Sequence, residues 1–164
     1  MHKKGIIHCD VGCHNAILVR HDRLKIIDFE GCSIDGATAT SCYEWFSYRR
    51  SMPSTSKQAD IFAYGYMVYE VITGRLPHKE LAAHEDRTAL VERRYNEDEF
   101  PNIENLPRGD FILGCWHGTI SSMSMGEVIR ILHAAMLSYS KVQVVGLLPD
   151  RWEGRMSLCF KAFN

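Results

Sequence analysis

The first hydrophobic pattern along the chain is a pair of short apolar segments around a polar tip. Ile17–Val19 and Leu24–Ile27 flank residues 20–23, and such runs of β-branched residues around a polar tip predict a β-hairpin. From Glu30 to Lys57 no periodicity survives and Ser, Thr and Gly are frequent. We therefore predict a long loop there. Long loops inside compact domains are usually functional.

The strongest predicted element is a helix from Ala59 to Thr73, which is apolar on every side and is followed by Gly74. A helix that is apolar all round is a buried one, and a glycine directly after it favours a left-handed cap. The segment is too short to cross a membrane, which takes about 20 apolar residues. We expect its tyrosines to pack in the core and not to stack on bases.

The second half of the chain predicts further helices. A charged helix is expected from Lys79 to Asn96, and Phe111–Trp116 is a short apolar segment. Ser124 followed by Glu127 is a capping-box pattern that opens another helix. After residue 138 the pattern changes to the strand-like Val142–Val145 and a turn at residues 149–154. The inner face of the charged helix is predicted to carry Leu81, Leu90, Val91 and Tyr95.

Composition narrows the class of protein. The chain has 164 residues, 46% of them hydrophobic and 24% charged, which suits one globular domain. A net charge of -1 argues against nucleic acid or an anionic membrane as partners. No signal peptide or membrane span is apparent, so we expect an intracellular, cytoplasmic protein whose six cysteines are reduced.

Candidate chemistry lies around the predicted hairpin. Asp10 is on the loop that enters it, Asn15 precedes its first strand, and Asp28 follows its second. Because a hairpin returns its second strand beside the start of the first, Asn15 and Asp28 can converge on one metal ion. Amide and carboxylate oxygens suit Mg²⁺, which keeps waters and takes phosphate oxygens as further ligands. Asp10 would then lie nearby as a carboxylate able to orient a hydroxyl or accept its proton.

These residues resemble the protein kinases, whose pattern is His-Arg-Asp, four residues, Asn, a hairpin and Asp-Phe-Gly. Here the pattern is His8-Cys9-Asp10, four residues, Asn15, the hairpin and Asp28-Phe29-Glu30-Gly31. Residues 60–65, Asp-Ile-Phe-Ala-Tyr-Gly, are similar to the start of the central kinase helix, and residues 70–77 are similar to its exit. Gly114-Cys115-Trp116 is similar to a later Cys-Trp helix. The finer likeness is to divergent single-domain kinases of filamentous fungi.

The resemblance implies a fold and a set of roles. The fold would be mainly α (α+β overall), a protein-kinase-like large lobe over residues 1–138 with a small β-hairpin that carries the catalytic residues. Residues 139–164 form a tail without assigned structure. Asp10 would be the catalytic residue, and Asn15 and Asp28 would hold Mg²⁺ and the phosphates of ATP. His8 and Asp60 would anchor the catalytic loop, and the partner would be a protein substrate.

The chain also departs from the family pattern. It begins where the first large-lobe helix ends, so we expect the small lobe to be missing, or a partner to cover the surface where that lobe docks. Residues 1–164 alone should show no measurable transfer, since positioning supplies most of phosphoryl-transfer catalysis. Cys9 replaces the Arg that receives a phosphorylated loop, and Gly12 stands where serine/threonine kinases have a Lys. Glu30 replaces the hinge glycine, and no Ala-Pro-Glu closes the loop.

Three alternatives remain open at this stage. One is a pseudokinase, a binding module that keeps the fold without transfer. Another is a small-molecule phosphotransferase of the aminoglycoside or choline kinase type, although residues 60–77 favour the protein kinases. The third, a zinc site at His8, Cys9, Cys13 and His14, is disfavoured because the spacing is tight and no second pair follows. Neither the substrate nor a preference among Ser, Thr and Tyr can be predicted.

Overall fold

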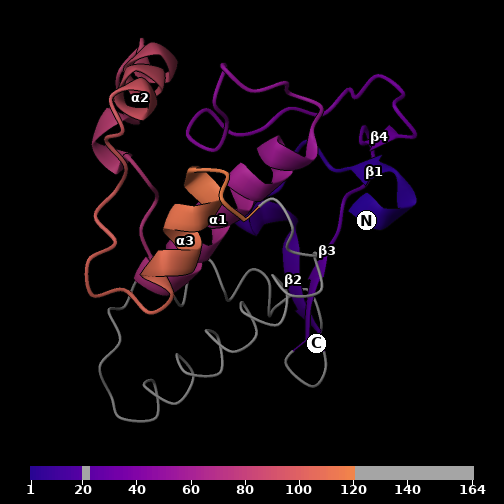
Figure 1. The fold of residues 1–164 in the computed structure, drawn as a ribbon, viewed down its shortest axis with the longest axis horizontal. Helices are drawn as coiled ribbons and strands as arrows, with labels where there is room; N and C mark the ends of the chain where they lie inside the picture. Colours follow the sequence, from indigo (N-terminus) through magenta and orange to yellow (C-terminus); the bar gives the residue numbers. More distant parts are fainter. Residues whose placement is uncertain (20–22, 121–164) are drawn as a thin grey trace.

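The predicted buried helix is α1, Lys57–Thr73, at the centre of a computed structural model that describes residues 1–19 and 23–120 (Figure 1). Ser56 caps its start by accepting a hydrogen bond from the Ala59 N–H at 3.0 Å. All residues from 59 to 68 are buried, and the last turn is partly exposed. The predicted helix is confirmed and begins two residues earlier than expected, at Lys57.

The end of α1 also follows the prediction. Gly74 has φ 66°, and its N–H donates to the Glu70 carbonyl at 2.9 Å. This left-handed backbone suits glycine because a Cβ is disfavoured there. The described tyrosines of α1 pack as core residues: Tyr64 and Tyr66 are each 1% exposed, and Tyr69 packs partly buried against the same cluster.

Helix α3, Gly109–Trp116, packs across α1 (Figure 1). Its apolar residues were predicted only as a short segment. The close approach depends on Gly65, where an added Cβ would lie 2.8 Å from the Trp116 ring and 2.9 Å from the Cys115 Cβ. The indole of Trp116 is fully buried, 4.8 Å from the Tyr66 ring centroid. Gly65 therefore lets the two helices share one core.

The single helix predicted over Lys79–Asn96 is wrong. The structure has a 3₁₀ turn, η3 (Lys79–Leu81), and then α2 (Arg87–Asn96). Residues 83–86 between them are exposed, so no apolar side chain is available there to hold a continuous helix against the core. Helical packing resumes with the predicted inner face, of which Val91 and Tyr95 are buried and Leu90 is partly buried.

The hairpin is confirmed as β2 (Ala16–Val19) and β3 (Arg23–Ile26), paired antiparallel with Ala16 opposite Ile26. The predicted loop after Glu30 contains one more strand. Ser33–Ile34 is β4, and it pairs with β1, Ile6–Ile7, near the N-terminus (Figure 1). A two-residue strand is too short to show alternation in the sequence, which is why the pattern missed it.

The second half of this loop packs against α2. Three contacts of different kinds join the two segments: the Tyr95 hydroxyl donates to the Phe46 carbonyl, the Arg50 N–H donates to Glu92 Oε2 at 2.8 Å, and the Arg87 guanidinium lies 5.6 Å from the centre of the Trp45 ring. Phe46 is itself 7% exposed and belongs to the core around α1. The long loop is thus packed against the protein along its second half.

Several predictions fall outside the described residues. These are the capping box at Ser124 and Glu127, the strand-like residues 142–145, the turn at 149–154 and the boundary at residue 138. No helix within residues 1–19 and 23–120 is long and apolar enough to cross a bilayer. The cysteines of the same part of the chain are free thiols.

Candidate active site

The loop that carries Asp10 is anchored by the carboxylate of Asp60, which is fully buried. Its Oδ2 accepts from the His8 N–H at 2.9 Å, and its Oδ1 accepts from the Cys9 N–H at 3.0 Å. Cys9 has φ 65°, an uncommon backbone conformation for a residue with a side chain. Two charge-assisted hydrogen bonds offset that strain and fix the start of the loop.

Two side chains also contact the carboxylate of Asp60. The Tyr43 hydroxyl donates to Asp60 Oδ1 at 2.8 Å, and His2 Nε2 lies 2.7 Å from Oδ2. A carboxylate has about four acceptor positions, so Asp60 is fully used by three separate segments of the chain. Sequence reasoning missed both partners, because no local pattern relates residues this far apart. Burial and the negative charge of Asp60 raise the pKa of Tyr43 above its usual range, which keeps the hydroxyl a donor.

Asp10 and Asn15 are brought together. Asn15 is 5% exposed, and its Nδ2 donates to the Asp10 carbonyl at 2.9 Å and to Asp10 Oδ2 at 3.0 Å. Because the nitrogen side of the amide faces two acceptors, the hydrogen bonds fix the amide orientation. The Oδ1 of Asn15 is therefore the atom that remains suited to a cation.

The backbone brings the residue before Asp28 next to Asn15. The Ile27 N–H donates to the Asn15 carbonyl at 2.9 Å, so Asp28 is the next residue after one bonded to Asn15. It is exposed, with φ 60°, a conformation that Asp tolerates better than most residues. One amide oxygen and one carboxylate form a donor set that fits Mg²⁺ when phosphate oxygens and water complete the shell.

A further contact of Asp10 was not predicted. His14 Nε2 lies 3.1 Å from Asp10 Oδ1, so the two oxygens of this carboxylate face His14 and Asn15 respectively. His14 entered the sequence analysis only within the rejected zinc cluster. Its spacing of four residues from Asp10 was the available signal, because a single turn of chain brings such residues together.

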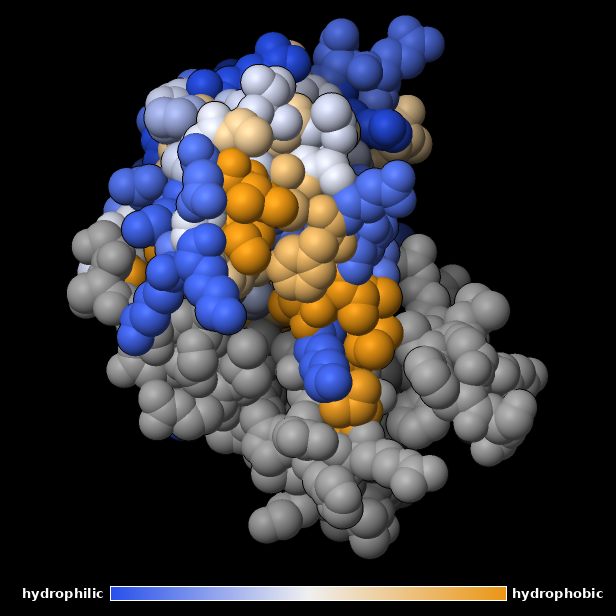
Figure 2. Space-filling view, turned by 90° about the vertical axis from the view of Figure 1, so that its right-hand side faces the viewer, coloured by the Kyte–Doolittle hydropathy of each residue, from blue (hydrophilic) through white to orange (hydrophobic). Residues whose placement is uncertain are grey.

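The surface next to the site is apolar and open. The Phe29 ring stands edge-on to His8, with centroids 5.0 Å apart, yet Phe29 is 44% exposed. Ile27 and Ile34 are also exposed, at 37% and 52%. Figure 2, which faces the side of the molecule where β1 and β4 lie, shows apolar surface gathered there. Exposed apolar residues in such a group are typical of an interaction surface.

His8 and Cys9 are engaged in ways that do not serve zinc. His8 is fully buried and its Nε2 lies 3.0 Å from the Ile27 carbonyl. Burial and the charge of Asp60 raise the pKa of the Cys9 thiol, which disfavours the thiolate that zinc requires. Within the described part of the chain, no group of three or more His, Cys, Asp or Glu side chains is arranged to hold a metal.

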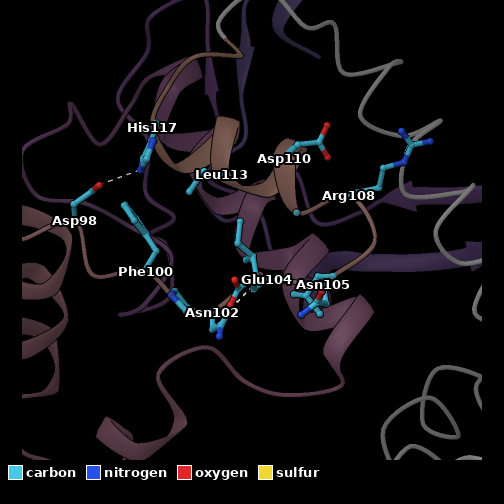
Figure 3. Close-up of a pocket in the computed structure, with 13 residues that line it drawn as sticks. Asp98, Phe100, Asn102, Glu104, Asn105, Arg108, Asp110, Leu113 and His117 are labelled. Atoms are coloured by element: carbon cyan, nitrogen blue, oxygen red, sulfur yellow. Dashed lines mark hydrogen bonds and ion pairs between the residues drawn. The ribbon is translucent and has the colours of Figure 1, made fainter.

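A hollow with other lining residues lies elsewhere. It measures about 800 Å³, between α3 and the preceding segment of residues 98–108, and His117 Nε2 pairs with Asp98 Oδ1 at 3.0 Å on one side of it (Figure 3). Acidic and apolar side chains line it, and none of the predicted site residues is among them. This hollow is separate from the candidate active site.

Comparisons with known proteins point to one family. A family model described as the protein kinase domain matches residues 1–138. The chain is 25% identical to the serine/threonine-protein kinase STY17 of Arabidopsis thaliana, over 81% of this chain and 24% of that protein. It is 31% identical to human mitogen-activated protein kinase kinase kinase 7, over 80% of this chain and 23% of that protein. It is 28% identical to the tyrosine-protein kinase receptor svh-2 of Caenorhabditis elegans, over 71% of this chain and 12% of that protein. The chain thus spans less than a quarter of the length of these relatives.

Proposed function

Because the chain belongs to the protein kinase domain family, we propose that residues 1–138 are the large lobe of a protein kinase that transfers phosphate from ATP to a protein hydroxyl. The observation that carries this proposal is how Asp10 is held: Asn15 donates to its carboxylate, and Asp60 accepts from the backbone N–H groups of the two residues before Asp10. A buried anchor holds the loop, and the loop presents one carboxylate beside a fixed amide. We also propose a cytoplasmic location, and we assign no role to residues 139–164.

Asp10 is the proposed catalytic residue. Held by Asn15 through Oδ2 at 3.0 Å, its carboxylate is able to orient the acceptor hydroxyl and to take its proton as the phosphoryl group is transferred. Positioning of this kind lowers the barrier because the reacting groups no longer have to find each other. Asp60 acts through the backbone and is a positioning residue.

Asn15 and Asp28 are the proposed ligands for Mg²⁺. The ion, when bound with ATP, neutralises charge on the phosphates. Asn15 is suited to this role through Oδ1, because its Nδ2 is committed to Asp10. Asp28 follows at the end of the hairpin with an exposed carboxylate.

A pseudokinase, a binding module without transfer, is the second candidate, and the open apolar surface is suited to binding a partner. Phe29 and Ile34 are 44% and 52% exposed, which leaves room for a small lobe or for a partner that covers the same surface. A small-molecule phosphotransferase receives less support, because the family model and the relatives described above are protein kinases.

The test compares residues 1–164 with a chain extended by the sequence encoded ahead of Met1. Binding of Mg²⁺–ATP is measured by thermal shift, and transfer to a mixed protein substrate is measured with radiolabelled ATP. We expect Mg²⁺-dependent binding and transfer by the extended chain, and no transfer by residues 1–164. Asp10→Asn should abolish transfer and retain binding, whereas the matched surface variant Asp98→Asn should change neither. Binding without transfer by the extended chain would favour the pseudokinase, and transfer that survives Asp10→Asn would exclude the proposed role.

A further inference from the structure

The Asp10 carboxylate is held from both sides. His14 Nε2 lies 3.1 Å from Oδ1, and Asn15 Nδ2 lies 3.0 Å from Oδ2. An ionised carboxylate only accepts hydrogen bonds, so the nitrogen of His14 that faces it carries the proton. This holds for both the neutral and the charged ring. His14 is therefore a donor to Asp10.

Gly12 leaves the space that this ring occupies. Its φ of -172° and ψ of 174° are extended backbone that any residue adopts. An added Cβ would lie 2.5 Å from His14 Cε1 and 2.7 Å from Nδ1, closer than non-bonded carbon and nitrogen atoms approach. The imidazole thus occupies the space that a side chain at position 12 would fill.

We infer that His14 is a positioning residue for Asp10 and that Gly12 is required to let its ring lie there, an inference that rests on the proposed function of Asp10. The ring limits the carboxylate to one rotamer, in which the remaining acceptor positions of Oδ1 and Oδ2 are available to a substrate hydroxyl. With the amide of Asn15 alone, the carboxylate would keep one restraint and could turn away from the hydroxyl.

The geometric part is tested on the full chain of 164 residues by NMR. The three-bond couplings about the Cα–Cβ bond of Asp10 report whether one rotamer is populated. We expect the couplings of a single rotamer in the natural chain and averaged couplings in His14→Ala. His14→Gln should restore the single rotamer, because its amide donates at a similar reach. Gly12→Ala should give averaged couplings as well, and should add nothing in the His14→Ala background.

A matched control comes from a second His–Asp pair. His117 and Asp98 lie 3.0 Å apart, with the histidine 35% exposed against 44% for His14. His117→Ala removes a similar contact far from the site and should leave the Asp10 couplings unchanged. Unchanged couplings in His14→Ala would overturn the inference, because Asn15 alone would then suffice to hold Asp10.

The catalytic consequence is measured separately. In the extended chain, His14→Ala should lower kcat about tenfold with an unchanged KM for ATP, as expected for one lost hydrogen bond to a charged group. His14→Gln should recover most of that rate, and His117→Ala should not alter it. A fall of less than about twofold in His14→Ala would also overturn the inference. If the extended chain without substitutions transfers no phosphate, the proposed function fails, and the couplings still decide whether His14 positions Asp10.

Discussion

Removing the Asp60 carboxylate tests the anchor on which the candidate site depends. In the unsubstituted protein, the backbone nitrogens of His8 and Cys9 lie 2.9 and 3.0 Å from the Asp60 carboxylate oxygens. Asp60→Ala removes this acceptor from both N–H groups. Both residues are buried, at 0% and 2% exposure, so water does not replace the lost partner. The Tyr43 hydroxyl and His2 lose an acceptor as well.

The expected cost follows from these contacts. An unsatisfied buried donor costs about 1–3 kcal/mol, so two orphaned amides account for about 2–6 kcal/mol, and we expect a loss near 4 kcal/mol. That is a large share of the stability of a domain this size, which is typically about 5–15 kcal/mol. Asp60→Asn keeps one acceptor but turns an N–H₂ toward a donor, so its loss should be about 2–3 kcal/mol.

The assay is urea unfolding of the full chain, followed by circular dichroism, with hydrogen exchange at the two amides. Asp98→Ala is the control, because its carboxylate is 72% exposed in a surface pair and should cost less than about 1 kcal/mol. A loss below about 1 kcal/mol in Asp60→Ala, or amides of His8 and Cys9 that stay protected, would refute the reasoning.

Three further outcomes follow from other contacts. Tyr43→Phe should cost about 1 kcal/mol and speed hydrogen exchange in residues 38–48 but not in α1. Burial and the nearby Arg94 charge lower the pKa of His78 to about 4. The unfolded chain binds a proton at His78 near pH 6.5, whereas the folded protein binds it only near pH 4. The free energy of unfolding is therefore unaffected by this group above pH 6.5 and falls as the pH drops toward 4. The free energy of unfolding, measured with urea, should therefore fall more steeply with decreasing pH in the natural chain than in His78→Phe. Gly65→Ala should destabilise by about 1–3 kcal/mol in urea unfolding, the reverse of the usual helix effect, because its Cβ would meet Trp116 at 2.8 Å.

The parts of the fold that local patterns encode were predictable. The hairpin and α1 follow from periodicity and from Gly74, since both depend on residues close in sequence. The pairing of β1 with β4 was not predictable, because a two-residue strand carries no period. The division of residues 79–96 depended on the exposure of residues 83–86, which is a property of the packed core and not of that segment.

The candidate site divides in the same way. Family resemblance singled out Asp10, Asn15 and Asp60, and the structure shows which groups these residues contact. His14 and Tyr43 were missed as partners because no pattern in the sequence relates either side chain to the carboxylate that it contacts. Only coordinates show that a ring lies over Gly12, or that a tyrosine reaches the anchor carboxylate.

The three links between α2 and the loop near Phe46 bear on how the surface evolves. A guanidinium on an indole, a phenol on a carbonyl and a backbone amide on a carboxylate each demand a different partner chemistry. At two of these contacts the loop supplies only backbone, the Phe46 carbonyl and the Arg50 N–H, so the helix residues Tyr95 and Glu92 are constrained while the loop side chains at these positions are free to vary. Only the contact of Arg87 with Trp45 joins two side chains, and there we expect replacements to occur in pairs.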